Sequence, residues 1–392
     1  MRILYILNAT DPYGGATKAI MHLTDGIIGT DVQVLFILPS DSGIANGLRE
    51  RGIPYRILDY RMAVYPPTQC FKDVLLFIPR LLGRICLNRR AAKQVALIAR
   101  EFHADIIHTN TSVNDIGYIA SRILHIPHVW HIREYADLYF KLYFYPSRTR
   151  YIQQFKSPDS YTICITKDIQ QYNGLQDCPT SRVIYDGVLH ESQSAFLLPK
   201  HRSFLFAGRL EPGKGIEELL HAYARYSTLT KKPIPLQIAG DTQDEQYKSR
   251  LETIVQQSGT EALVTFLGER KDILDLMQCC MALIVPSRAE GFGFVTTEGM
   301  FSGALVIGRN TRGTKEQFDN GLALSGQEIA LRYNTPDELI DLLCRVTDEG
   351  LIPYLTMAKT GQSVAKQLYS VESHVKAVSQ FYNDILQHRQ QQ

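Results

Sequence analysis

The sequence lacks the features that mark several large classes of protein. Its formal net charge is only +2, which gives no indication of a nucleic-acid partner. No run reaches the roughly 18 apolar residues of a membrane-spanning helix. The apolar start at residues 1–8 is too short for a signal peptide and has no small-residue cleavage site. We therefore expect a cytoplasmic protein, with contact at the inner face of the cell membrane left open.

Cysteine is present but in no pattern that holds a fold or a metal. The seven cysteines are odd in number and scattered, at Cys70, Cys86, Cys164, Cys178, Cys279, Cys280 and Cys344. Their spacing fits neither a zinc site nor a disulfide framework, so we expect reduced thiols. The sequence also has no Asp-x-Asp metal-binding signature and no G-x-G-x-x-G dinucleotide fingerprint. We accordingly expect no metal ion, no nicotinamide and no other cofactor.

The length of 392 residues favours two domains of similar size. Short apolar runs alternate with helical patterns in both halves, which is typical of parallel α/β sheets. The sequence predicts two doubly wound, Rossmann-like domains, 1–188 and 203–370. The polar residues 189–202 have no clear period and are interpreted as a linker.

The stretch 287–300 carries two glycines and two carboxylates at a predicted strand-to-helix turn. The run 281–286 is predicted to be a buried strand, and a helix is predicted from about Thr296 to Ser302. Glycines let backbone N–H groups approach a ligand closely, and a helix N-terminus attracts an anion. Glu290 and Glu298 can accept hydrogen bonds from hydroxyl groups, so the stretch suits a ligand with phosphate between hydroxyl-rich rings. The alternative is that Glu298 is a first-turn glutamate favoured by the helix dipole and Glu290 a surface residue.

Two glycine-rich turns elsewhere are candidates for phosphate contacts. Arg209 and Lys214 lie among glycines between a predicted strand at 203–207 and a helix from about Ile216. Two cations at such a turn can hold a diphosphate through charge-assisted hydrogen bonds; the alternative is a solvated loop. Gly14 and Gly15 follow the first predicted strand and let the backbone pass close to a bound group, unless they form a plain tight turn.

Two further features of the first half have both structural and functional interpretations. His131 and Arg133 follow a short predicted strand, where ligands bind in open α/β sheets. A histidine in such a place is either catalytic or a packed, hydrogen-bonding residue. Residues 71–90 mix apolar and basic side chains and are predicted to be helical. Such a helix either contacts an anionic membrane surface or buries its apolar face in the domain.

Together, three motifs closely resemble those of the retaining glycosyltransferases of family 4, which have the GT-B fold. The motifs are Gly208-Arg-Leu-Glu-Pro-Gly-Lys-Gly215, Glu290-Gly-Phe-Gly-Phe-Val-Thr-Thr-Glu298 and Gly313-Thr-Lys-Glu316. The resemblance covers nearly the whole chain. It implies two Rossmann-like domains facing each other across a cleft, with the C-terminal helix 371–392 packing back on the first domain.

The resemblance also implies roles for individual residues. Arg209 and Lys214 would bind the donor diphosphate and stabilise the leaving group, Glu290 would hold the transferred sugar, and His131 would lie near the reacting centre. The other residues implied at the donor are the ribose ligand Glu298, the phosphate-side Gly14 and Gly15, the base-side Arg270, and the loop residues Gly291, Phe292, Gly293, Phe294 and Val295.

The expected function is transfer of a sugar from a nucleoside-diphosphate sugar to a saccharide or lipid-linked saccharide. Retention of configuration is implied by the resemblance, and a uridine diphosphate donor is the commonest case. The product would serve a cell-surface polysaccharide or glycolipid. Two alternatives stay open: a sugar-nucleotide epimerase of the same fold, and a non-catalytic subunit that binds sugar nucleotides.

Overall fold

Contacts divide the chain into two compact units. A computed structural model describes residues 1–8, 10–11, 14–28, 31–65, 71–138, 141–288 and 290–390. One unit comprises Met1–Gly187 together with Val371–Gln392, and the other is Val188–Ser370. The segment 189–202, interpreted above as a linker, is part of the second unit. It includes the short 3-10 helix η2 (Glu191–Gln193).

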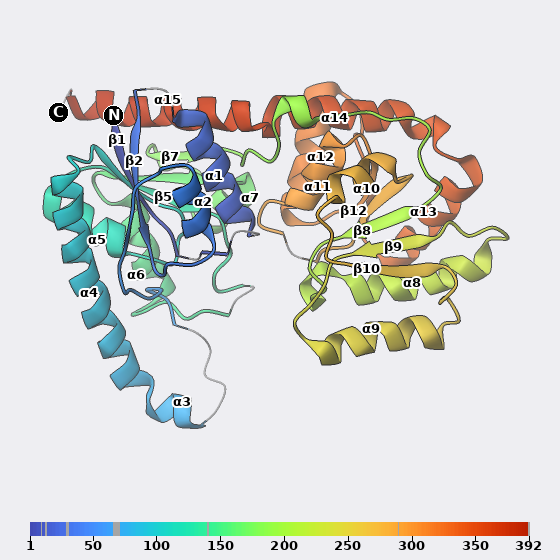
Figure 1. The fold of residues 1–392 in the computed structure, drawn as a ribbon, viewed down its shortest axis with the longest axis horizontal. Coiled ribbons are helices and arrows are strands. Elements are labelled where there is room, and N and C mark those ends of the chain that lie inside the picture. Colours follow the sequence, from blue (N-terminus) through green and yellow to red (C-terminus); the bar gives the residue numbers. More distant parts are fainter. Residues whose placement is uncertain are drawn as a thin grey trace. The chain divides into compact units, whose positions relative to one another are not determined.

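The first unit is built on a parallel sheet with the strand order β3-β2-β1-β4-β5-β6-β7 (Figure 1). The strands are β1 (Arg2–Ile6), β2 (Gln33–Leu38), β3 (Tyr55–Ile57), β4 (Ile106–Thr109), β5 (His128–Ile132), β6 (Ser160–Cys164) and β7 (Ser181–Val183). The helices are α1 (Gly15–Ile27), α2 (Ile44–Glu50), α3 (Phe71–Leu75), α4 (Phe77–Glu101), α5 (Ile116–Leu124), α6 (Arg148–Ile152), the 3-10 helix η1 (Gln153–Lys156), α7 (Lys167–Tyr172) and α15 (Val371–Gln390).

Alternation along the strands of the first unit divides its core into two layers. On β1, Ile3 and Tyr5 face the core that α1, α2 and α15 cover. Leu4 and Ile6 face the opposite core, which α4 and α5 cover. Helix α15 packs against α1, and Figure 1 shows it crossing near one end of that helix. Helix α15 therefore completes the core of the first unit, although in the sequence the whole second unit lies between α15 and the rest of the first unit.

The second unit repeats the design with the parallel strand order β10-β9-β8-β11-β12-β13. Its strands are β8 (Phe204–Ala207), β9 (Leu236–Ala239), β10 (Val264–Gly268), β11 (Ala282–Val285), β12 (Leu305–Arg309) and β13 (Leu331–Tyr333). Its other elements are η3 (Pro212–Lys214), α8 (Ile216–Leu229), α9 (Glu245–Gln257), α10 (Ile273–Cys279), α11 (Phe294–Phe301), α12 (Arg312–Ser325), α13 (Pro336–Glu349), η4 (Ile352–Tyr354) and α14 (Leu355–Tyr369).

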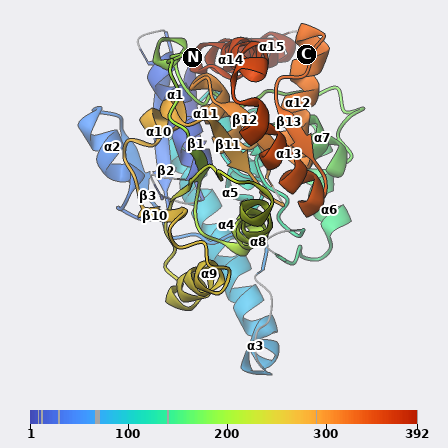
Figure 2. The ribbon, with the colours of Figure 1, turned by 90° about the vertical axis from the view of Figure 1, so that its right-hand side faces the viewer.

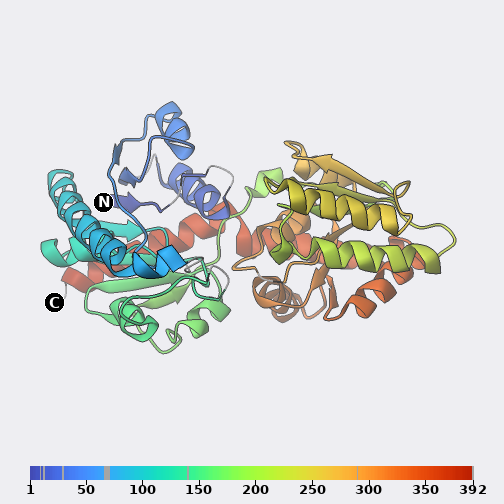
Figure 3. The same ribbon diagram turned by 90° about the horizontal axis from the view of Figure 1, so that it is seen from below.

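Helices cover both faces of this second sheet. The core on one face is shared with α8, α9 and α13, and Figure 3 shows α8 and α9 side by side there. Helices α11, α12 and α14 pack against β12 and one another on the other face. The prediction of two doubly wound α/β sheets is confirmed.

The helix predicted within residues 71–90 is present as α3 and the first half of α4. Helical hydrogen bonds continue across the junction at Leu76, and α4 runs on to Glu101 because its second half buries small and branched residues such as Ala92 and Val95. Figures 1 and 2 show α3 at the end of α4 farthest from the strands of its own unit. Across the described ranges, no helix combines the length and apolar character needed to cross a membrane.

Candidate functional site

The second sheet has a point at which its connections diverge. From β8 the chain winds outward through β9 to β10, whereas from β11 it winds the other way through β12 to β13. Strands β8 and β11 are hydrogen-bonded neighbours. In open α/β sheets, ligands bind beyond the carboxyl ends of the two strands at such a point. The loops that follow β8 and β11 are those that carry Lys214 and Glu290.

The two loops are held together backbone to backbone. Gly215 has φ +72°, and a Cβ atom there would lie 2.1 Å from the carbonyl oxygen of Pro286. Any side chain at position 215 is therefore excluded, both by the backbone conformation and by the contact. In addition, the amide of Arg288 donates to the carbonyl of Gly213 at 3.0 Å. These contacts fix the turn after β8 against the strand end of β11.

Lys214 and Glu290 form an ion pair at this point. The distance from Nζ to Oε1 is 2.7 Å, and the side chains are 22% and 14% exposed. The residues are 76 positions apart in the sequence, so the fold brings two predicted site residues into contact. Both retain enough exposure to meet a ligand, and a bound phosphate or hydroxyl group can compete for either partner.

Hydrogen bonds from α12 support the glycine-rich loop 290–293. The amide nitrogen of Gln317 donates to the carbonyl oxygens of Phe292 at 2.7 Å and Gly293 at 3.2 Å. The amide of Gly313 donates to the carbonyl of Glu290, and a Cβ atom at Gly313 would lie 2.4 Å from the Phe292 oxygen. Sequence reasoning missed Gln317, because a glutamine inside a helix carries no signal of a loop contact.

Helix α11 begins at Phe294, two residues earlier than predicted. Its N-cap is Gly293, which offers no side-chain acceptor, and no acidic residue lies in its first turn. The amides at the start of α11 therefore receive no side-chain cap, which is the arrangement that favours an anionic ligand. Glu298 is the fifth residue of the helix and half-buried. The alternative explanation of Glu298 as a first-turn, dipole-favoured residue is consequently removed.

The structure does not bring the other two predicted cations to this pair. Arg209 follows β8, but its side chain is 75% exposed and pairs with Glu211 at 2.9 Å. Arg270 follows β10, two strands away from β8, and its guanidinium pairs with the exposed Asp272. Of the three predicted cations, Lys214 is the one that pairs with Glu290 in this conformation.

In the first unit, a buried charged pair lies at the carboxyl edge of the sheet. Arg133 follows β5 and donates from Nη1 to Asp186, which follows β7, at 2.5 Å. Arg133 Nε donates to Asn110 Oδ1 at 2.9 Å, and Asn110 in turn donates to the carbonyl of Ala16 in the first turn of α1. The side chains of Arg133 and Asp186 are 4% and 1% exposed. This network ties three strand ends to the start of α1.

His131 lies inside the first unit, with no exposed surface. Its Nδ1 accepts from Arg133 Nη2 at 3.2 Å and lies 3.2 Å from His108 Nε2. Burial, and secondarily the charge of Arg133, lower the pKa of His131 well below its usual value, so the ring is neutral. Its ring stacks on His374 of α15. Strand alternation explains this position, because side chains of β5 alternately face the α15 layer and the opposite one.

A role for His131 at the reacting centre therefore stays a prediction. The ring is buried and contacts Arg133, and it is not exposed at the surface of the unit.

Gly14 is the N-cap of α1, and Gly15 its first residue. Part of the loop before them, at positions 9, 12 and 13, lies outside the described residues. Among the residues that are described, no group of three or more His, Cys, Asp or Glu is placed to hold a metal ion.

The comparisons with known proteins define the class. Residues 191–384 match the family described as Glycosyl transferases group 1. An uncharacterized glycosyltransferase of Methanocaldococcus jannaschii, MJ1178, is 26% identical over 289 residues, which is 72% of this chain and 76% of that protein. The serotype-specific mannosyltransferase WbdA of Escherichia coli is 31% identical over 103 residues, which is 26% of this chain and 13% of WbdA.

Solved structures agree on the fold. HepE (Alr3699) of Anabaena, in complex with UDP, has a TM-score of 0.78 at 21% identity and is matched over 98% of this chain and 100% of that one. Sucrose-phosphate synthase of Thermosynechococcus elongatus has a TM-score of 0.71 at 16% identity, over 99% and 100% of the two chains. The fold is thus that of GT-B enzymes. The comparisons thus support a glycosyltransferase, and residues 191–384 match the model of group 1 of that class.

Proposed function

We propose that this enzyme transfers a sugar from a nucleoside-diphosphate sugar to a saccharide or lipid-linked saccharide, with retention of anomeric configuration. The observation that carries this proposal is the Lys214–Glu290 pair beside the uncapped start of α11, at the divergence point of the second sheet. A cation, a carboxylate and backbone amides without a side-chain cap are groups that a sugar nucleotide can engage. Retention is supported by the motif resemblance.

Lys214 would act on the leaving group. Breaking the glycosyl–phosphate bond builds negative charge on the departing diphosphate, and a fixed ammonium group aimed at that charge stabilises the transition state more than the ground state. Arg209, whose side chain is 75% exposed, would add a second positive charge after release from Glu211. Glu290 would accept hydrogen bonds from the transferred sugar, and Glu298 from the ribose. Because two cations supply the charge, we expect turnover to persist in EDTA.

UDP-sugars are the first donors to test, since structures of HepE hold UDP and UDP-glucose. WbdA is a mannosyltransferase, so an activated mannose belongs in the same panel. Phe294 is partly exposed and packs against Phe292 with ring centroids 5.5 Å apart. Its ring is a candidate for limiting the size of the donor sugar.

Helices α3 and α4 support a contact with an anionic membrane surface. Five apolar side chains recur at helical spacing on these helices and are exposed: Phe71, Val74, Leu75, Ile78 and Leu82. Lys72, Arg80, Arg89 and Arg90 are exposed on the same segment. Apolar side chains enter the acyl boundary while the cations meet anionic headgroups. Such a contact would place the enzyme beside lipid-linked acceptors and polysaccharide precursors.

Incubation with radiolabelled UDP-glucose, UDP-galactose, UDP-N-acetylglucosamine and GDP-mannose tests the chemistry. Slow hydrolysis of one donor, with transfer when an acceptor extract is added, is the expected result. Interconversion of sugar nucleotides would instead identify an epimerase, and binding without turnover a non-catalytic partner. The anomeric proton coupling of the product, measured by NMR, tests retention.

A further inference from the structure

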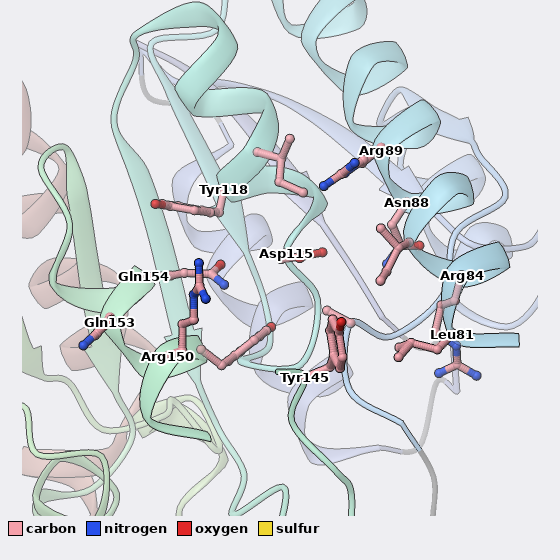
Figure 4. Close-up of a pocket in the computed structure, with 14 residues that line it drawn as sticks. Leu81, Arg84, Asn88, Arg89, Asp115, Tyr118, Tyr145, Arg150, Gln153 and Gln154 are labelled. Carbon is pink, nitrogen blue, oxygen red and sulfur yellow. The ribbon is translucent and has the colours of Figure 1, made fainter. Parts of the chain in front are cut away.

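The first unit contains a cavity of about 490 Å³ between α4, the start of α5 and the segment of α6 and η1 (Figure 4). Small-molecule sites commonly have volumes of roughly 300–1,000 Å³. The cavity lies on the α4 and α5 side of the sheet, and all its lining residues belong to the first unit. It is distinct from the Lys214–Glu290 pair, and none of the motifs discussed above accounts for it.

Two acceptor atoms that line this cavity have no hydrogen-bond partner in the described part of the chain. Asp115 Oδ1 and Gln154 Oε1 are buried, and neither has a hydrogen-bond partner among the described residues. A buried acceptor without a partner is unfavourable unless a ligand or water supplies a donor. In Figure 4, Asp115 lies near the middle of the lining side chains. Hydroxyl groups are the donors that such a pair of acceptors would take from a ligand.

Two cations approach the same cavity from different elements. Arg89 belongs to α4 and Arg150 to α6, and both are exposed cavity-lining residues. Within the described ranges, neither guanidinium forms a hydrogen bond or a close ion pair with a carboxylate. Arginine binds phosphate and carboxylate groups in a bidentate manner. The rings of Tyr118 and Tyr145 also line the cavity and offer apolar faces to a sugar ring.

We propose that this cavity binds the phosphate-bearing sugar of the acceptor, with Arg89 and Arg150 on the phosphate and Asp115 and Gln154 on the hydroxyl groups. The proposal rests on the proposed function, because it assumes a saccharide acceptor. A phosphate ester beside a sugar occurs both in soluble sugar phosphates and in lipid-linked saccharides. Leu81 lines the cavity, and the exposed Ile78 and Leu82 are its neighbours on α4, so a lipid chain has an apolar surface to follow.

Equilibrium binding to the full chain tests this assignment with two probes: a soluble hexose 1-phosphate, and a polyprenyl-diphosphate-linked sugar in detergent micelles. The Arg89→Ala/Arg150→Ala variant is expected to weaken binding at least ~10-fold, since each guanidinium supplies a charge-assisted hydrogen bond. The matched control, Lys93→Ala/Arg100→Ala, removes two exposed cations of α4 that do not line the cavity and should bind as the wild type does.

The pattern of binding also identifies the source of the phosphate. If both probes bind, the cavity recognises the sugar phosphate without a lipid chain. If only the lipid-linked probe binds, recognition also requires contact between the lipid chain and the apolar surface of α4. Tyr145→Leu should weaken binding of the sugar phosphate but leave binding of inorganic phosphate unchanged. Equal binding by the wild type and the Arg89/Arg150 variant, or no binding of either probe, overturns the proposal. Acceptor-independent donor hydrolysis, measured alongside, separates that failure from failure of the proposed function.

Discussion

The two units share one architecture but use their charged strand ends differently. In the first unit, Arg133 is buried against Asp186 and Asn110, and its donors are directed at protein atoms. In the second, Lys214 is 22% exposed and has one carboxylate partner in Glu290, while Arg209 is 75% exposed. Both units thus carry cations at the carboxyl edge of a parallel sheet. In the first unit the cation is held by protein groups, whereas in the second the cations are partly or mostly exposed to solvent.

This difference separates structural charge from functional charge. A buried ion pair whose hydrogen bonds are filled by protein contributes mainly to holding elements together, and loss of one partner leaves an uncompensated charge. A partly exposed pair gives little stability and is free to exchange its partner for a ligand. The comparison therefore predicts that loss of Arg133 acts mainly on folding, whereas loss of Lys214 acts mainly on turnover.

Arg133→Met should give the largest effect on stability. It leaves Asp186 buried and unpaired, which costs about 3–5 kcal/mol of unfolding free energy. Urea unfolding followed by circular dichroism measures this change. Arg225→Met is the control, since its pair with Asp337 is exposed on both sides and should change stability by at most about 1 kcal/mol. Similar shifts in the two variants would show that the buried network is not what holds these strand ends.

Lys214→Ala should give the largest effect on turnover. Removal of one group that stabilises the departing charge lowers kcat by about 10²–10³-fold, while stability should change by about 1 kcal/mol or less. Steady-state transfer assays and urea unfolding of the same preparation measure the two quantities. Lys248→Ala removes a comparable half-exposed pair with Asp241 and should leave turnover unchanged. A Lys214 variant with wild-type kcat would remove this residue from the mechanism.

Much of the fold could be predicted from the sequence because its strands are short, continuous apolar runs. The runs at 281–286 and 203–207 correspond to β11 and β8 within one or two residues. Strand β13 has only three residues, Leu331–Tyr333, and its central Arg332 gives no buried pattern. The contact between Lys214 and Glu290 joins two residues that the motifs had singled out by their concentration of glycine and charge.

The partners that complete each site could not be predicted, because they come from distant parts of the chain. Gln317 supports the glycine loop 24 and 25 residues away, and Asp186 meets Arg133 across 53 residues. The burial of His131 could not be predicted either, since the side chain of a polar residue at a strand end can face either helical layer. Only the pairing of β5 within the sheet decides which layer that is.

Asp115→Asn should change how stability depends on pH. Burial raises the pKa of Asp115 from near 3.8 to about 6, so between these values the folded state binds more protons than the unfolded state. Stability should therefore fall as pH rises from about 4 to 6, by up to about 3 kcal/mol for this group. The variant should lose that slope and be more stable than the wild type at pH 7. Asp348→Asn, at an exposed position, should keep the wild-type slope in urea unfolding at pH 4, 5, 6 and 7.

Arg209→Ala should give the smallest effect and the sharpest contrast with Arg133. Its side chain is mostly exposed and pairs only with Glu211, so stability should change by less than about 0.5 kcal/mol. If Arg209 turns to the donor diphosphate, loss of one charge-assisted hydrogen bond raises the donor KM or lowers kcat/KM about 10-fold. Kinetics with a varied donor concentration measure this, and Arg270→Ala, which lies two strands away, tests whether the base-side cation contributes equally. An Arg209 variant with lower stability but unchanged kcat/KM would place this cation with the structural charges and reverse the contrast between the two units.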